Sequence, residues 1–173
     1  MSALFSPLQV KSLTLRNRIA VAPMCQYSAS EGLANDWHLH HYAGLARGGA
    51  GLVVVEATAV AAEGRISPAC LGLWNDQQAQ VLAGVARAIK AGGAVAGIQI
   101  AHAGRKASAN RPWEGDDHIA EDDPRGWPTL SPSPLAFGGH LSRQPQAMQL
   151  EDIARVQADF VAAAQRALAA GFE

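Results

Sequence analysis

The stretch LVVVEATA, residues 52–59, decides how this chain folds. Leu52-Val53-Val54-Val55 is a continuous apolar run rich in β-branched side chains, which is typical of a parallel strand buried on both faces. Glu56-Ala57-Thr58-Ala59 places small and polar residues after this run or within its end. Because parallel strands need long crossover connections, the rest of the fold depends on the segments on either side.

A helix is predicted on each side of this strand. From about Asp36 to Arg47 the sequence favours a helix, and Gly48-Gly49 ends it. After the strand, Asn75 or Asp76 caps a second helix that ends at Gly92-Gly93. The apolar stripe of this second helix is predicted to consist of Val81, Leu82, Val85 and Ile89.

Two further strands are expected outside these helices. They are Arg18-Ile19-Ala20-Val21-Ala22 and Val95-Ala96-Gly97-Ile98-Gln99-Ile100. Alternation of strands and helices implies right-handed βαβ units and a parallel sheet. Ahead of the first strand, residues 8–11 and 13–15 predict a small hairpin around Ser12, which in a barrel would plug the amino-terminal end.

A long segment follows the third strand, from about His102 to Ala147, and shows no helical period. Loops of this length are unusual unless they serve a site. A last helix is predicted from Leu150 to Ala170, and Phe172-Glu173 then opens another strand. Its apolar face is expected to comprise Ile153, Val156, Phe160, Val161, Ala164 and Leu168. A barrel, a doubly wound sheet and an open three-layer domain all accommodate this order.

Composition excludes several classes of function. The chain has 173 residues, 17% of them charged, and a net charge of −1, so no overall field favours nucleic acid or an anionic membrane. Its longest apolar stretch, residues 52–62, is interrupted by Glu56 and is too short to span a bilayer, and the amino terminus lacks the pattern of a signal peptide. The two cysteines, Cys25 and Cys70, indicate reduced thiols in a cytoplasmic protein, with Cys70 expected to be buried.

Three segments are candidates for the chemistry, because α/β folds build their sites at the carboxyl ends of parallel strands. They are Pro23-Met24-Cys25-Gln26-Tyr27, Glu56-Ala57-Thr58-Ala59 and residues 99–106. Each places small or polar residues after an apolar strand, where a flat ligand can lie against the backbone. The amide of Gln99 offers a donor and an acceptor to the ring edge of a heterocycle. The alternative is a buried Gln99 that bridges neighbouring loops inside the barrel.

No motif for another cofactor is found. The sequence has no Gly-x-x-x-x-Gly-Lys loop and no strand-linked Gly-x-Gly-x-x-Gly, and residues 48–51 fit a turn from helix to strand. His38 and His41 share a helix face while His40 points elsewhere, and no carboxylate or cysteine has a suitable spacing beside them. We therefore predict no metal site and expect these histidines to pack on the sheet or to bond at the helix start.

Blocks of sequence at these segments are recognisable. They are residues 15–19 with Ala22–Tyr27, residues 48–51 with Val55–Val60, and residues 99–106. Together they resemble the old yellow enzyme family of NADH:flavin oxidoreductases. Cys25 points to the bacterial branch that includes the xenobiotic reductases, and residues 108–113 are similar to the same group. The resemblance covers essentially the whole chain. It implies an α/β fold, the amino-terminal half of a (β/α)8 TIM barrel, with residues 1–173 as one partial domain and no second domain.

The resemblance also assigns roles to the site residues. It implies FMN as the cofactor, with NADPH, or less often NADH, as hydride donor. Pro23, Met24 and Cys25 would lie along the flavin, and the Cys25 thiol would adjust its reduction potential. Ala57 would leave room for the ring, and Gln99 would hydrogen-bond its pyrimidine edge. Tyr27 would orient an oxygen or nitro group of the substrate.

The implied reaction is reduction of activated C=C bonds. Hydride passes to the β-carbon of an α,β-unsaturated carbonyl, paired donors polarise the carbonyl, and a tyrosine protonates the α-carbon. Enones, nitro compounds and quinones are the expected substrates, and the intact protein is expected to form a homo-oligomer without nucleic-acid or membrane partners. The family's donor pair, proton donor and phosphate anchor follow later strands, so we expect them beyond Glu173.

Two alternatives stay open at this point. A dienoyl-CoA or enoate reductase shares these barrel blocks, and a catalytically silent half-barrel that needs a partner chain would equally lack the donor pair. We expect the isolated chain neither to retain FMN nor to stay monomeric, because its sheet edges are open and the phosphate anchor is missing.

Overall fold

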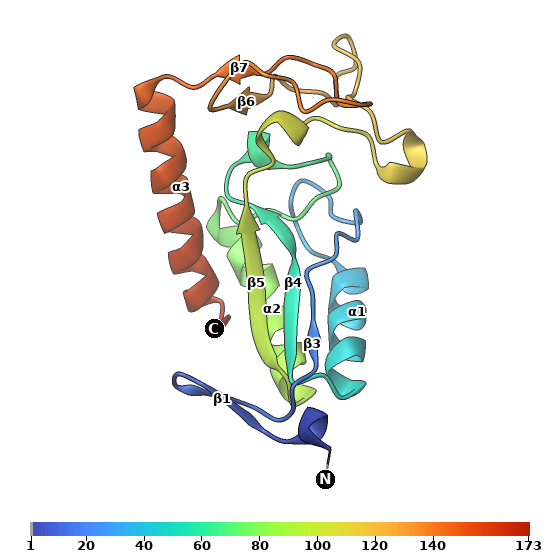
Figure 1. Cartoon of the computed structure of the whole chain (residues 1–173), viewed down its shortest axis with the longest axis vertical. Coiled ribbons are helices and arrows are strands. Elements are labelled where there is room, and N and C mark those ends of the chain that lie inside the picture. Colours follow the sequence, from blue (N-terminus) through green and yellow to red (C-terminus); the bar gives the residue numbers. More distant parts are fainter. Residues whose placement is uncertain (1) are drawn as a thin grey trace.

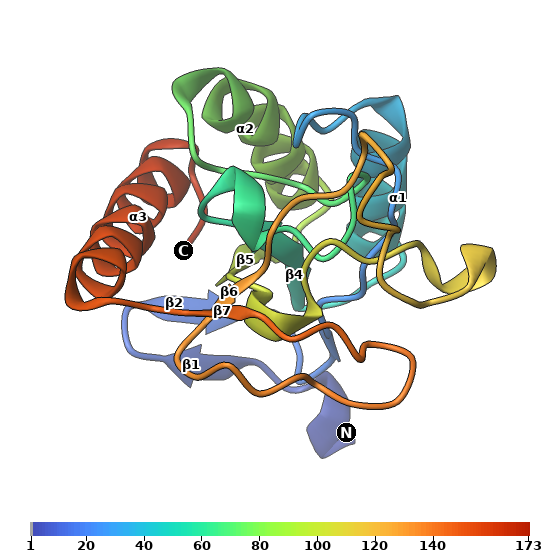
Figure 2. The same cartoon turned by 90° about the horizontal axis from the view of Figure 1, so that it is seen from above.

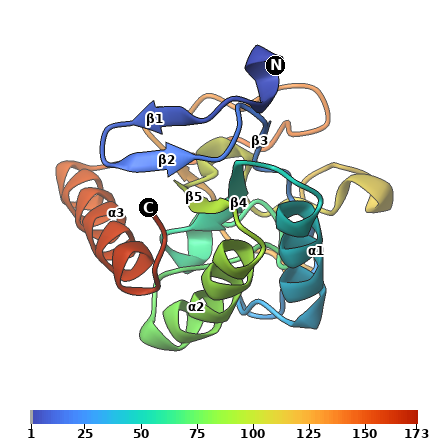
Figure 3. The same cartoon turned by 90° about the horizontal axis from the view of Figure 1, so that it is seen from below.

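Three parallel strands, β3 (Ala20–Val21), β4 (Leu52–Ala59) and β5 (Val95–Ala101), form the central sheet in that order. The structure is a computed structural model that describes residues 2–173. Val53 pairs with both Val21 and Ala96, so the strand formed by residues 52–59 lies in the middle. The helices α1 (Asp36–Arg47), α2 (Asp76–Ala91) and α3 (Leu150–Ala169) curve along one side of the sheet, and the other side carries no helix (Figures 1 and 3).

The two helices that flank β4 begin at asparagines. The side chain of Asn35 accepts the N–H of Trp37, and that of Asn75 accepts the N–H of Gln78. These caps satisfy backbone donors that a helix start leaves unpaired, and both helices have the predicted bounds. The predicted stripe of α2 is wrong in one residue: Val81 is exposed, whereas Leu82, Val85 and Ile89 are buried.

The predicted apolar face of α3 is wrong in three of its six residues. Ile153, Val161 and Leu168 are exposed, whereas Phe160 packs against the core, as do the buried Ala163 and Ala167. Alanines lack bulk, so α3 approaches α2 and β5 closely along this stripe. Several adjacent stripes of α3 are apolar, and the packing partner selects one of them.

The end of the chain lies beside β5, as expected for a fourth strand. Phe172 is buried in the core, and the N–H of Glu173 donates to the carbonyl of Ala96 at 2.9 Å. The last two residues thus pack on the core and bond β5 at Ala96.

The predicted hairpin is confirmed as β1 (Leu8–Val10) and β2 (Leu13–Leu15), which pair antiparallel. It lies at the end of the sheet where the parallel strands begin (Figures 1 and 3). Arg16 follows the hairpin and donates to the carbonyls of Ala46 and Ala50, next to the end of α1. The hairpin thus covers the end of the sheet opposite the candidate site.

The long segment after β5 lies across the carboxyl ends of the strands (Figure 2). It contains the 3-10 helices Gly104–Lys106 and Pro112–Glu114 and two short strands that the sequence did not predict, β6 (Leu130–Ser131) and β7 (Gln146–Ala147). The Arg65 guanidinium lies 5.4 Å and 4.9 Å from the ring centroids of Trp74 and Trp127. These contacts fix the long segment to the connection between β4 and α2. Across residues 2–173, no helix is both long and apolar enough to span a membrane.

Candidate functional site

The structure brings the three candidate segments together at one edge of the sheet. The segment 23–27 follows β3, Glu56 and Ala57 lie near the end of β4, and Gln99 lies near the end of β5. β4 is hydrogen-bonded to both other strands, so these residues come from adjacent strands. This is the edge where parallel α/β folds place their ligands.

A β-bulge shapes this edge. Val55 pairs with Ile98 and Thr58 with Ile100, so Glu56 and Ala57 together face the single residue Gln99. A bulge of this kind re-aims side chains that strict alternation would place otherwise. Here it lets Glu56 follow Val55 on the helix side, where its carboxylate meets Tyr42 of α1. Ala57 then alternates to the opposite face and is only half-buried.

Gln99 lies on the open face of the sheet. Its side chain is exposed, and it has no hydrogen-bond partner among the described residues. The physical reason is the face on which it lies, because the helices of residues 2–173 cover the opposite face of the sheet (Figure 1). Within residues 2–173, its amide is therefore free to bond a ligand and bridges no loops.

The loop after β3 presents Met24, Cys25 and Tyr27. Met24 is exposed and Cys25 is half-buried. Burial, followed by the proximity of Cys70 and Glu56, raises the pKa of the Cys25 thiol from 9.0 to about 11. Cys25 is therefore a neutral thiol near pH 7, a weak donor rather than a nucleophile. Cys70 is buried, as predicted.

Tyr27 has an unusual backbone conformation. Its φ is 50°, a left-handed value that favours glycine and costs a β-carbon-bearing residue free energy. Its ring meets the indole of Trp113 edge to face, with centroids 5.7 Å apart. Burial, then the neighbouring Cys25, raises the pKa of the Tyr27 phenol, which keeps the hydroxyl protonated. The sequence did not give Trp113 a role; the signal was its place in a long loop that serves a site.

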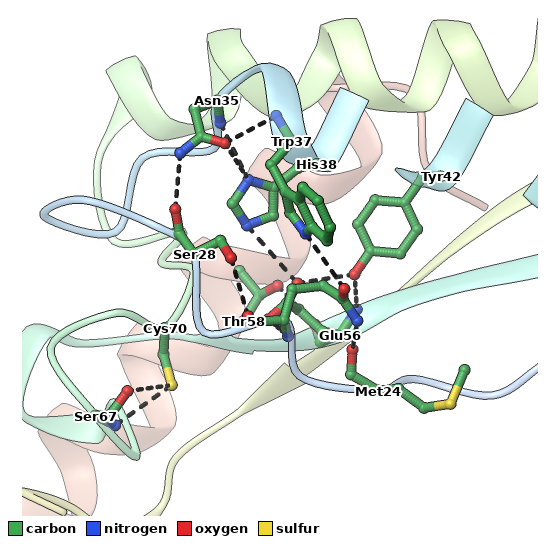
Figure 4. A network of polar contacts seen from close by, with 11 residues as sticks. Met24, Ser28, Asn35, Trp37, His38, Tyr42, Glu56, Thr58, Ser67 and Cys70 are labelled. Atoms are coloured by element: carbon green, nitrogen blue, oxygen red, sulfur yellow. Dashed lines mark hydrogen bonds and ion pairs between the residues drawn. The ribbon is translucent and has the colours of Figure 1, made fainter. Parts of the chain in front are cut away.

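A buried polar network lies behind this loop (Figure 4). The Glu56 carboxylate is fully buried; it accepts a hydrogen bond from the Tyr42 hydroxyl at 2.9 Å and from the Gln26 N–H at 2.8 Å. Its Oε1 also lies 3.8 Å from Nε2 of His38. Burial raises the pKa of Glu56, and the Gln26 N–H and the Tyr42 hydroxyl act against this shift. The sequence analysis gave Glu56 no role of its own, and the signal for one was a single acidic side chain inside an apolar strand.

The histidines of α1 have structural contacts. Nδ1 of His38 lies 3.1 Å from the backbone N–H of Asn35, which completes the cap of the helix. His41 stacks on Trp37 with ring centroids 6.2 Å apart. Within residues 2–173, no three side chains that could hold a metal ion gather in one place.

The residues at this edge fit a flat heterocycle. The backbone of Pro23 to Cys25 gives one wall, and the small side chain of Ala57 leaves space beside it. The unpaired amide of Gln99 matches a ring edge that alternates donors and acceptors. The isoalloxazine ring of FMN has these properties.

Comparison with known proteins supports FMN as the cofactor. The chain matches the NADH:flavin oxidoreductase / NADH oxidase family over residues 3–173. An NADH:flavin oxidoreductase of Gibberella zeae is 43% identical over 171 residues, which are 98% of this chain and 41% of the relative. An NADPH dehydrogenase of Listeria welshimeri is 45% identical over 175 residues, which are 100% of this chain and 47% of the relative. The chain thus spans less than half the length of these relatives.

Solved structures confirm the fold. Morphinone reductase superposes with a TM-score of 0.82 at 29% identity, over 98% of this chain and 46% of that protein. The old yellow enzyme homologue from Zymomonas mobilis gives a TM-score of 0.79 at 27% identity, over 99% of this chain and 46% of that protein. The predicted partial (β/α)8 barrel is confirmed. Because the family match extends over nearly every residue, this chain belongs to the NADH:flavin oxidoreductase / NADH oxidase family, oxidoreductases that use FMN.

Proposed function

We propose that this chain supplies the strand-end wall of an FMN-dependent NAD(P)H oxidoreductase that reduces activated C=C bonds of α,β-unsaturated carbonyls. The observation that carries the proposal is the shared edge of Cys25, Tyr27, Ala57 and Gln99, with the Gln99 amide exposed and unpaired within residues 2–173. Residues 2–173 would then form part of one barrel domain, with the remaining strands completing the site.

The proposed binding roles are those that the family resemblance implies, and the shared strand-end edge supports them. Pro23, Met24 and Cys25 would line the flavin with their backbone, Ala57 would leave room for the ring, and Gln99 would hydrogen-bond its pyrimidine edge. FMN, when bound, accepts hydride from a reduced nicotinamide and donates it to a substrate. Both nicotinamides are candidates, since one relative is named an NADPH dehydrogenase and the other an NADH:flavin oxidoreductase.

Two side chains would act on the reacting groups. The Cys25 thiol stays protonated near pH 7, since its pKa is about 11, and would offer the flavin a weak, polarizable donor. The Tyr27 hydroxyl also stays protonated, because burial raises its pKa, and would hydrogen-bond an oxygen or nitro group of the substrate. Enones, nitro compounds and quinones carry such groups, as in substrates of the xenobiotic-reductase type.

The setting of the whole protein is part of the proposal. Cys25 and Cys70 are both free thiols, which suits a reducing cytoplasm. The exposed apolar residues of α3, Ile153, Val161 and Leu168, favour further packing on that face. We expect this packing to include assembly into a homo-oligomer.

A half-reaction experiment tests the proposed function. The protein that carries the complete barrel is loaded with FMN and reduced with NADPH without oxygen, and 2-cyclohexen-1-one is then added. We expect NADPH to bleach the visible flavin absorption and the enone to restore it, with cyclohexanone as product. Bleaching without recovery would contradict the alkene substrate class. Absence of bleaching by NADPH, and by NADH in a parallel sample, would contradict the proposed function.

A further inference from the structure

Glu56 is a fully buried acidic side chain at this edge of the sheet, and the proposed binding roles do not use it. Its carboxylate and the His38 ring are completely buried. Burying a carboxylate is costly unless its oxygens receive hydrogen bonds. The groups that satisfy Glu56 therefore indicate what this carboxylate holds in place.

Helix α1 contributes two side chains to the surroundings of Glu56. The Tyr42 oxygen accepts the backbone N–H of Glu56 at 3.0 Å, so its own proton is directed to Oε1 of the carboxylate. The His38 ring is held at the helix start, where Nδ1 lies 3.1 Å from the Asn35 N–H and 3.0 Å from Asn35 Oδ1. Its Nε2 lies 3.8 Å from Oε1 of Glu56 and has no hydrogen-bond partner among the described residues. Helix α1 thus places the Tyr42 hydroxyl and the His38 ring beside one carboxylate oxygen.

The other carboxylate oxygen faces the loop after β3. Oε2 of Glu56 accepts the Gln26 N–H at 2.8 Å, between Cys25 and the left-handed residue Tyr27. Other contacts on this loop include the exposed 3.3 Å bond from the Trp37 indole to the Gln26 side chain and the 3.0 Å bond from the Ser28 hydroxyl to the Gln26 carbonyl. A hydrogen bond to a buried group gains strength from the low dielectric around it. The contact with Glu56 therefore ties this turn to the interior of the protein.

We propose that Glu56 is a positioning residue that joins β4 and α1 to the Gln26 backbone and so fixes Cys25 and Tyr27 in their site conformation. The same bulge that turns Glu56 toward the helix places Ala57 on the flavin side. The bulge of β4 therefore determines both the free space beside Ala57 and the position of the loop that Glu56 bonds. The proposal rests on the proposed function for the roles of Cys25 and Tyr27, but its test does not require flavin.

The two thiols of the chain allow a direct test. Cys25 belongs to the loop, whereas Cys70 is buried and bonded to Ser67, so it reports on global unfolding. Iodoacetamide labelling of the purified protein, followed by peptide mass spectrometry across pH 7 to 10, gives the reaction rate of each thiol. The variants are Glu56→Gln, Tyr42→Phe and, as matched control, Thr58→Val. The Thr58 hydroxyl bonds the carbonyl of Glu56 at 2.8 Å rather than the loop.

We expect Glu56→Gln to raise the labelling rate of Cys25 about tenfold and Tyr42→Phe to raise it about threefold, with Cys70 protected. Thr58→Val should leave both rates unchanged. The proposal is overturned if Cys25 reacts at the wild-type rate in both Glu56→Gln and Tyr42→Phe. It is also overturned if Cys25 and Cys70 become reactive together in both, which would make Glu56 a residue of global folding.

The pH series separates position from charge, because the neighbouring Glu56 charge itself raises the pKa of Cys25. If only Glu56→Gln reacts faster, and a lower thiol pKa accounts for the whole increase, Glu56 acts by its charge and the positioning role is wrong. As a second readout, Tyr42→Phe in the FMN-loaded protein should shift the visible flavin spectrum, and Thr58→Val should not. Labelling that follows the expected pattern while NADPH fails to bleach the flavin would keep the positioning role and reject the proposed function.

Discussion

The rings of Tyr27 and Trp113 meet edge to face, with centroids 5.7 Å apart and planes inclined by 83°. Tyr27 follows β3, and Trp113 belongs to the 3-10 helix Pro112–Glu114 of the long segment after β5. The long segment therefore reaches the candidate site, as its length led us to expect. Trp113 is still 65% exposed, so its indole has free surface beside the phenol that we assign to the substrate.

We predict that Trp113→Ala raises KM for a flat cyclic enone about 2- to 10-fold and changes kcat less. An aromatic contact contributes about 0.5–1.5 kcal/mol beyond the area it buries, which corresponds to this range. The measurement is steady-state turnover of 2-cyclohexen-1-one at saturating NADPH. Trp113→Phe is the control, because it keeps an aromatic edge against Tyr27 and should stay within about twofold of wild type. An unchanged KM in Trp113→Ala would show that substrates do not use this wall.

Gln99 separates ligand binding from stability. Because its side chain is exposed and unpaired within residues 2–173, Gln99→Ala should change the free energy of unfolding by less than about 0.5 kcal/mol. Loss of its hydrogen bonds to a ring edge should weaken FMN binding about 10-fold. Flavin fluorescence titration and urea unfolding measure the two quantities. Gln80→Ala, at an exposed glutamine of α2 whose side chain makes no hydrogen bond within residues 2–173, should alter neither; equal flavin affinity of the Gln99 and Gln80 variants would contradict the role of Gln99.

The helices around β4 could be predicted closely because their end signals are local. Asn35 and Asn75 each bond an N–H within three residues, and glycines follow both helices. Local chemistry of this kind is readable from the chain alone. The core-facing side of α3 is not local, since Ala163 rather than Val161 packs inward only in the presence of α2 and β5.

The candidate site could be located from the sequence, but its geometry could not. The strand-end rule correctly grouped residues 23–27, 56–59 and 99–106. The bulge at Glu56 and Ala57 arises from the pairing of β4 with β5. The sequence therefore did not indicate that Glu56 points into the interior, except by its place in an apolar run. The exposure of Gln99 depends on which face of the sheet the helices cover, and its place in an apolar strand does not indicate that face.

His38 should make stability depend on pH. Burial, followed by the nearby His41, lowers the pKa of His38 from 6.5 to about 4. On acidification, His38 therefore takes up its proton near pH 6.5 in the unfolded chain but only near pH 4 in the folded chain. This contribution to stability is present above pH 6.5 and is lost as the pH falls toward 4, up to about 3 kcal/mol. The raised pKa of Glu56 acts in the opposite direction.

A substitution isolates the share of His38. His38→Gln copies the cap of α2, in which Gln78 at the same helix position accepts from the backbone of Asn75. Urea unfolding from pH 4.5 to 7.5 should show a smaller loss of stability on acidification in the variant than in the wild type. Parallel curves for the two proteins would mean that His38 does not titrate differently on folding.

Arg16 should contribute stability at the end of the sheet away from the site. Its guanidinium donates to the Ala50 carbonyl at 2.9 Å and 3.1 Å and also to the Ala46 carbonyl, near the C-terminus of α1. A cation at this helix end is favourable to the helix dipole. Arg16→Ala should lower the free energy of unfolding by about 1–3 kcal/mol. Arg16→Lys should lower it by less, because an ammonium cannot reproduce the planar fork.

Arg18→Ala is the matched control for Arg16. Arg18 bonds Ser6 at 3.3 Å in an exposed position, so its removal should cost less than about 0.5 kcal/mol. Urea unfolding compares the three variants, and flavin titration should give the wild-type affinity for all of them, because the hairpin and the candidate site lie at opposite ends of the sheet (Figure 1). If Arg16→Ala weakened FMN binding while its unfolding curve stayed unchanged, the hairpin would have to act on the site rather than cover the far end of the barrel.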